Sequence, residues 1–456
     1  MRRPYGVTMG GTGTISARRA YVEGRFAPAA VRFEDGVITA VGPFDPDADT
    51  VLPEDAMLLP GLVDSHVHLN DPGRADWEGF ATGTAAAAAG GVTTIVDMPL
   101  NSVPVTTSPE ALAAKRMAAR GKLAVDVAYW GGAVPDNIGA LTRLARAGVV
   151  GFKAFLAPSG IDEFPPLDAD GLAAAMTELA LSGAGALVVH AEDPARLHPD
   201  GPLGIRYRDF LAARPEDSET AAVATVIDAA RRTGARAHIV HLSAAAALPL
   251  VRAAKADGVR LTAETCPHYL TLDAAEVPDA APVYKCCPPI RDRANQDALW
   301  EGVLDGTIDA IVSDHSPAPA AMKRRGDGDW GLAWGGVAGL QTGLAVVASA
   351  ARERGVPLAA LLPLMTEGPA RIAGLDRLGA VRPGSPAHLV DFRPDQTVRL
   401  AKADLAYRHP VSPWLGRELT GVVAATYLRG TMVYRRGDGV LTRAGREVLP
   451  APAGAR

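Results

Sequence analysis

Several potential metal ligands stand at the ends of short apolar runs in this sequence. Each one closes or directly follows a run rich in Val, Ile, Leu or Phe; the set is His66, His68, Lys153, His190, His241 and Asp314. Side chains two apart on a strand point to the same face, so His66 and His68 can act together. Imidazole and carboxylate groups are the ligands that first-row divalent ions use in proteins. A single histidine at a strand end is usually a packing residue, but all six together predict a metal site.

Lys153 differs from the rest of this set because a protonated amine cannot ligate a metal ion, and a buried ammonium is costly. A carbamate formed with CO₂ would make it an anionic ligand with two oxygens, able to bridge two metal ions. The alternative is a lysine that reaches the rim or pairs with Asp314. We therefore predict a CO₂-derived carbamate on Lys153, and the ligand types suit zinc, with manganese, cobalt, nickel or iron as alternatives.

The runs that carry these residues alternate with helical segments. The expected strands are 57–67, 92–98, 123–130, 149–156, 186–190, 237–242, 260–264 and 308–313. The expected helices between them include 108–120, 169–181, 220–233, 245–256 and 293–304. Continuous apolar runs separated by helices are typical of parallel strands. About eight such units predict a (β/α)8 TIM barrel over residues 61–375, with its active site at the C-terminal ends of the strands.

The two flanks of the chain have a different pattern. Residues 1–60 and 376–456 contain short alternating segments separated by Gly and Asp-Gly turns, as expected for antiparallel strands. Neither flank alone could bury one face of a sheet. We expect both ends to pack together as one small β-sandwich.

Composition excludes several classes of function. The formal net charge is −5, and no basic run exceeds Lys323-Arg324-Arg325, which indicates neither nucleic acid nor an anionic membrane as partner. No run is long enough to span a membrane, and no apolar segment follows the first residues as in a secretory signal. The three cysteines, Cys266, Cys286 and Cys287, show no disulfide or zinc spacing, so we expect a reduced, cytoplasmic protein.

Other histidines receive weaker interpretations. His238 lies three residues before His241 and has the opposite strand parity, so we expect it to face the helical shell. His268 and His315 are expected near the mouth of the barrel, where support of the metal site and simple packing both remain open. His198, His388 and His409 fall in loops or in the C-terminal flank and are not assigned to the site.

At these residues the sequence resembles the amidohydrolase superfamily, in its branch of dihydroorotases, hydantoinases and allantoinases. The motifs PGLVDSHVHL, GFKAFL, VVHAED, HIVHLS and VSDHSP carry the six candidate ligands. The resemblance implies two metal ions bridged by carbamylated Lys153, with His66, His68 and Asp314 on the more buried ion and His190 and His241 on the other. It also implies the split β-sandwich and a homotetramer.

Within this branch the segments are most similar to those of allantoinases. Dihydroorotases carry an arginine two residues after the second histidine, and Asn70 stands there in this chain. Hydantoinases carry a tyrosine in the loop after the lysine, whereas this loop reads LAPSGIDEF. A neutral amide suits an uncharged ring better than an anionic one. The segments VDMPLNSVPVTT, ETCPHYL, KCCPPIRD and AWGGVAGLQ are also similar to allantoinase segments.

The resemblance implies hydrolysis of the small molecule allantoin to allantoate, with Asp314 as general base and then acid. We expect five residues to hold the ring, the last two through their main chains: Asn70, Asn101, Ser159, Cys287 and Gly335. One alternative is a hydantoinase or dihydropyrimidinase that opens another cyclic amide. A metal-free barrel serving as a binding protein is the other.

Overall fold

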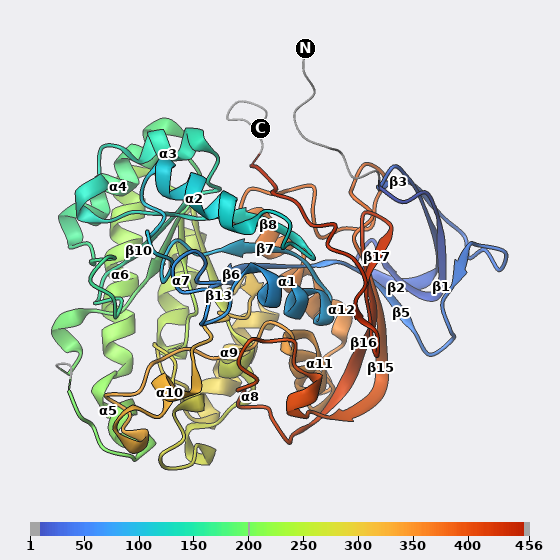
Figure 1. Ribbon diagram of the computed structural model, residues 1–456. Coiled ribbons are helices and arrows are strands. Elements are labelled where there is room, and N and C mark those ends of the chain that lie inside the picture. Colours follow the sequence, from blue (N-terminus) through green and yellow to red (C-terminus); the bar gives the residue numbers. More distant parts are fainter. Residues whose placement is uncertain (1–9, 199–200, 451–456) are drawn as a thin grey trace.

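Parallel strands that alternate with helices form a barrel from the middle of the chain (Figure 1). The structure is a computed structural model that describes residues 10–198 and 201–450. The barrel strands are β6 (Leu62–Val67), β7 (Val92–Asp97), β8 (Asp126–Tyr129) with its continuation β9 (Gly131–Gly132), β10 (Phe152–Phe155), β11 (Leu187–His190), β12 (Ala237–Ile239), β13 (Leu261–Thr265) and β14 (Ala310–Ile311). They pair in chain order, and a parallel bridge between Val67 and His315 closes the ring. The predicted (β/α)8 barrel is confirmed.

Helices surround this barrel or lie in the loops at its rim (Figure 1). They are α1 (Phe80–Ala89), α2 (Pro109–Ala119), α3 (Leu141–Ala147), α4 (Ala169–Ser182), α5 (Tyr207–Ala213), α6 (Glu216–Thr233), α7 (Leu248–Ala256), α8 (Pro267–Thr271), α9 (Arg293–Leu304), α10 (Ala320–Lys323), α11 (Gly343–Glu353), α12 (Leu358–Met365) and α13 (Glu367–Ile372). Caps determine where several of them begin, because the Asp168 carboxylate accepts from Gly171 N at 2.8 Å and that of Asp292 from Asn295 N at 2.9 Å. Among the described helices, none has the length and apolarity needed to cross a membrane.

Both ends of the described chain contribute to a nine-stranded sheet beside the barrel (Figure 1). Its strands are β1 (Gly13–Val22), β2 (Arg25–Glu34), β3 (Val37–Gly42), β4 (Thr50–Val51), β5 (Met57–Pro60), β15 (Leu389–Arg399), β16 (Glu418–Leu428), β17 (Thr431–Arg435) and β18 (Gly439–Val440). The two halves meet where β5 pairs antiparallel with β15 and parallel with β1. The predicted joining of the two termini in one β-structure is therefore confirmed.

The expected strand 57–67 is two strands in the structure. The chain breaks at Gly61, whose N–H donates to His388 O at 2.8 Å, while Leu62 N donates to Gly91 O at 3.0 Å. A β-carbon at Gly61 would lie 2.2 Å from Thr93 Oγ1, so only glycine allows this close approach. β5 thus joins the terminal sheet and β6 the barrel. The exact division of the chain at residues 60 and 376 stays a prediction.

Candidate active site

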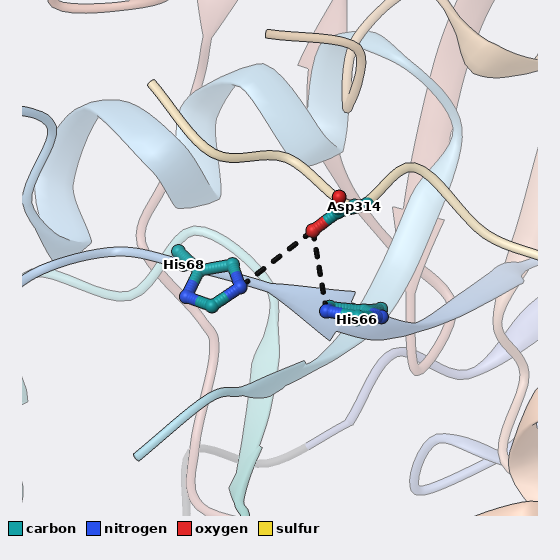
Figure 2. Close-up of side chains that lie close together, drawn as sticks. All are labelled: His66, His68 and Asp314. Carbon is teal, nitrogen blue, oxygen red and sulfur yellow. Dashed lines mark ion pairs between the residues drawn. The ribbon is translucent and has the colours of Figure 1, made fainter. Parts of the chain in front are cut away.

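A histidine in the first barrel strand, a second one just after that strand and an aspartate after the last strand converge at the mouth of the barrel. His66 ends β6 with Val67, and its Nε2 lies 3.2 Å from Asp314 Oδ1, while His68 Nε2 lies 3.6 Å from the same oxygen. Figure 2 shows both imidazole rings turned toward the carboxylate. All three side chains are buried, and their ligand atoms lie within 4.8 Å of one another.

The charge of Asp314 is held in place by these neighbours. Burial raises the pKa of its carboxyl group, but His66, His68 and His241 outweigh burial and hold the pKa well below its usual value. Burial lowers the pKa of His68 to about 4, although Asp314 opposes this shift. The pair is therefore a carboxylate and a neutral imidazole at neutral pH. Neutral imidazole and ionised carboxylate are the forms that ligate metal ions.

A second pair of histidines lies directly beside the first. His190 Nδ1 is 3.0 Å from His241 Nε2, and the ring centroids of His66 and His241 are 5.4 Å apart. His190 uses its other nitrogen, Nε2, to bind Glu192 Oε2 at 2.7 Å. In the neutral ring this bond leaves the lone pair on Nδ1, which faces His241. The four predicted histidines thus form one continuous row of rings.

Lys153 on β10 lies among these groups. Its ammonium is 4.9 Å from the centre of the Phe155 ring, and Phe155 in turn stacks on His190 at 4.7 Å. Lys153 interacts electrostatically with His68, His190, His241 and Asp314. Burial lowers its pKa to about 8, against the opposing effect of Asp314 and Glu264. A lowered pKa increases the fraction of neutral amine, the form that reacts with CO₂.

The backbone adopts an uncommon left-handed conformation at four residues of the predicted site. Nine described residues other than glycine have a positive φ, and four belong to the predicted site: Asn70 at 62°, Asn101 at 59°, His241 at 38° and Asp314 at 43°. This conformation is unfavourable for residues with a side chain and collects at functional sites, where surrounding structure holds it.

Carboxylates that the sequence reasoning missed support three of the histidines. Glu264 on β13 binds His66 Nδ1 at 2.5 Å and His238 Nε2 at 2.9 Å. Glu192, which binds His190, is itself held by Arg214 through bonds of 3.0 and 2.5 Å. Glu264 was detectable by the rule that gave the candidate ligands, since it is a polar residue near the end of the seventh apolar run.

The expectation that His238 faces the helical shell was wrong. Its ring is fully buried and binds Glu264, the carboxylate that also holds His66 inside the barrel. The parity rule failed because β12 ends at Ile239 and His241 has a left-handed backbone, so alternation does not continue from His238 to His241.

His315 supports the site through its main chain, since its carbonyl accepts from His68 N at 2.8 Å.

Comparison with known proteins identifies the family. The model of the amidohydrolase family matches residues 57–433. The chain belongs to the amidohydrolase family. It is 51% identical over 416 residues to the allantoinase of Streptomyces avermitilis, covering 90% of this chain and 93% of the relative. It is 40% identical over 391 residues to the allantoinase of Saccharomyces cerevisiae, covering 84% of each chain.

A solved structure extends this similarity to the fold. The L-hydantoinase (dihydropyrimidinase) from Arthrobacter aurescens superposes with a TM-score of 0.88 at 28% identity, covering 95% of this chain and 99% of the hydantoinase. The predicted resemblance to allantoinases and the prediction of a hydrolytic enzyme are both confirmed.

The donor groups of this amidohydrolase fit divalent metal ions. In a neutral His66 ring whose Nδ1 donates to Glu264, the lone pair is on Nε2, which faces the carboxylate oxygen of Asp314 at 3.2 Å. Two lone pairs directed at each other repel unless a cation or a proton lies between them. Among the described side chains, the buried atoms Nδ1 of His68 and Nδ1 of His241 have no hydrogen-bond partner. The set combines imidazole and carboxylate, which suits zinc and neighbouring metals.

The residues expected to hold the ring lie on several loops of the amidohydrolase. Asn70 is buried, and its Nδ2 donates to Pro317 O at 3.4 Å while its Oδ1 has no partner among the described groups. The main-chain oxygen of Asn101 accepts from Arg74 at 2.9 Å. A β-carbon at Gly335 would lie 4.0 Å from Cys287 Sγ, so these two are neighbours.

Ser159 occupies a loop of its own. Its hydroxyl contacts Phe164 O at 2.7 Å and Ile161 O at 3.1 Å, so it is engaged in shaping this loop. The loop contacts the others, because a β-carbon at Gly160 would lie 3.6 Å from the Trp334 ring. The role of all five residues in binding a substrate stays a prediction.

Proposed function

We propose that this chain hydrolyses the cyclic amide bond of allantoin to give allantoate. The observation that carries the proposal is the row of buried His68, His66, His241 and His190 rings beside Asp314 and Lys153, in a chain 51% identical to an allantoinase. A mouth that contains the neutral Asn70 favours an uncharged ring over an anionic one.

In this proposal His66, His68 and Asp314 would hold one divalent ion, His190 and His241 would hold the second, and a carbamate on Lys153 would be a further ligand. Zinc is the expected metal, with manganese, cobalt, nickel and iron as alternatives. Two bound ions would supply Lewis-acid chemistry, lowering the pKa of water and polarising a carbonyl group. The buried position of these side chains excludes bulk water and strengthens electrostatic interactions within the site.

The protein's own contribution to the reaction is proton transfer and orientation. The Asp314 carboxylate accepts a proton from the water that attacks the ring carbonyl carbon. When the carbon–nitrogen bond breaks, Asp314 returns this proton to the departing ring nitrogen. Ser316 Oγ donates to Asp314 Oδ1 at 3.0 Å and helps to fix the carboxylate.

The substrate assignment is tested by comparing allantoin, hydantoin, dihydrouracil and dihydroorotate, with metal and bicarbonate supplied and then with a chelator. We expect hydrolysis of allantoin that is lost on chelation. A preference for hydantoin or dihydrouracil would retain the metal mechanism but replace the substrate, as the similarity to the Arthrobacter aurescens hydantoinase allows. No activity and no bound metal would overturn the proposal. A homotetramer belongs to the same proposal and is tested by light scattering.

A further inference from the structure

Two buried lysines lie beside the predicted ring-binding residues and have no part in the mechanism above. Lys285 directly precedes the Cys286-Cys287 pair, and Lys323 ends α10. Lys285 is only 7% exposed and Lys323 only 6%. Burial lowers the pKa of Lys323 to about 7. Burying a lysine amine is costly in either protonation state unless its N–H groups are hydrogen-bonded, so both side chains need acceptors at this place.

Both ammonium groups bind main-chain carbonyls of a single segment, residues 329–336. Lys285 Nζ donates to Ala333 O at 2.6 Å and to Gly331 O at 3.3 Å. Lys323 Nζ donates to Gly336 O. The main chain of Lys285 adds a further bond, because its carbonyl accepts from Gly336 N at 2.8 Å. The bonded carbonyl groups therefore lie both before and after Gly335 in the chain.

The sequence of this segment explains why it needs such support. It contains three glycines, Gly331, Gly335 and Gly336, and forms no helix or strand. Glycine-rich backbone without secondary structure loses much conformational entropy when it is ordered. An ammonium group has three donors and can bind several carbonyls at once, which makes lysine suitable for holding such a backbone.

The segment is also where several loops of the mouth meet. The Trp334 ring lies 5.1 Å from that of Trp77, and a β-carbon at Gly160, which follows Ser159, would lie 3.6 Å from the Trp334 ring. Gly335 neighbours Cys287. Gly336 approaches Ser316 so closely that a β-carbon would lie 2.2 Å from its carbonyl oxygen. Residues 329–336 therefore touch the loops that carry four different parts of the predicted site.

We propose that Lys285 and Lys323 are positioning residues that fix residues 329–336 against Cys287, so that the main chain of Gly335 meets the substrate ring in one orientation. The part concerning the ring rests on the proposed function, whereas the fixing of the segment does not. The ammonium groups act through the backbone and do not contact the reacting atoms.

The test compares Lys285→Met and Lys323→Met with Lys255→Met. Lys255 is a matched control because its ammonium also binds main-chain oxygens, Gly306 O at 3.3 Å and Thr307 O at 2.7 Å, together with Asp309, which directly precedes β14 at the opposite end of the barrel. Hydrogen exchange of residues 329–336 is measured in the metal-loaded proteins without substrate. We expect exchange there to be at least about tenfold faster in the first two variants and unchanged in the control.

Steady-state kinetics supply the second measurement. We expect KM for allantoin to rise about tenfold in Lys285→Met and Lys323→Met, with kcat and metal content close to those of the native protein. Lys323→Arg, which keeps N–H donors at this position, should retain more of the native exchange rate than Lys323→Met.

Unchanged exchange in both methionine variants would overturn the proposal. So would loss of folding in both while Lys255→Met folds, since the lysines would then support the whole barrel. Faster exchange with no hydrolysis of allantoin by the native protein would retain the role of the lysines and reject only the proposed substrate.

Discussion

Glu264 Oε1 lies 2.5 Å from His66 Nδ1, and Glu264 Oε2 lies 2.9 Å from His238 Nε2. One buried carboxylate therefore joins histidines of two separate strands, β6 and β12. Burial raises the pKa of Glu264, but the two histidines outweigh it and hold the pKa at about 2. The carboxylate stays charged at neutral pH and keeps His66 Nε2 directed toward Asp314.

Replacing Glu264 with glutamine should weaken metal binding. The amide keeps the size of the side chain but removes the charge that orients His66, and loss of such a partner lowers metal affinity by roughly 10–100-fold. Titration of the metal-free protein, followed by calorimetry, measures this effect. Glu276→Gln, at an exposed position, is the control. Equal affinity in both variants would reject the orienting role.

Asp314→Asn should nearly abolish turnover while the protein keeps bound metal. An amide cannot carry the proton from water to the ring nitrogen, and loss of a general acid–base group lowers kcat by about 10²–10⁴-fold. His66 and His68 remain in place to hold the ion. The measurements are kcat for allantoin and the metal content of the same preparation. Near-native turnover would exclude Asp314 as the proton carrier.

The proposed carbamate predicts a dependence on CO₂. Protein prepared in CO₂-free buffer should lose activity and metal content, and bicarbonate should restore both. Lys153→Met should bind less metal and show no response to bicarbonate, because its side chain cannot form a carbamate. Native mass spectrometry should find the mass of one CO₂ on the wild-type protein only. Full activity without CO₂ would favour Lys153 as an amine paired with Asp314.

The convergence of the candidate ligands at one mouth could be predicted because it depends on local rules. Each follows a continuous apolar run, and the C-terminal ends of parallel strands meet at one mouth. The orientation of His238 could not be predicted, since it depends on where β12 ends and on the left-handed backbone of His241. The two contacts of Glu264 could not be predicted either, because only the packed barrel shows that its carboxylate reaches both His66 and His238.

The arrangement of the residues expected to hold the substrate ring depends even more on contacts between residues that are distant in the sequence. Gly335 and Cys287 are neighbours although 48 positions separate 287 from 335 in the sequence. Likewise, the break of the expected strand 57–67 at Gly61 depends on His388 and Thr93. The pattern of apolar residues carries no information about such pairs, so the sequence reasoning could place the loops but not their contacts.

His268 should make the stability of the metal-free protein depend on pH. It is fully buried, neither ring nitrogen has a hydrogen-bond partner among the described groups, and burial lowers its pKa to about 4. In the unfolded chain a histidine has a pKa of about 6.5. Between these values unfolding takes up a proton, so the stabilising effect is complete above about pH 6.5 and is lost as the pH falls toward 4.

His268→Gln removes this titration. The free energy of unfolding, measured with denaturant between about pH 4 and 6.5, should therefore fall less steeply in the variant, by up to about 1.4 kcal/mol per pH unit. His68, whose pKa is also lowered to about 4, contributes in the same direction in both proteins and leaves a residual slope. His198→Gln, at an exposed position, should keep the native slope. Equal slopes in His268→Gln and the native protein would show that His268 is not held neutral by burial.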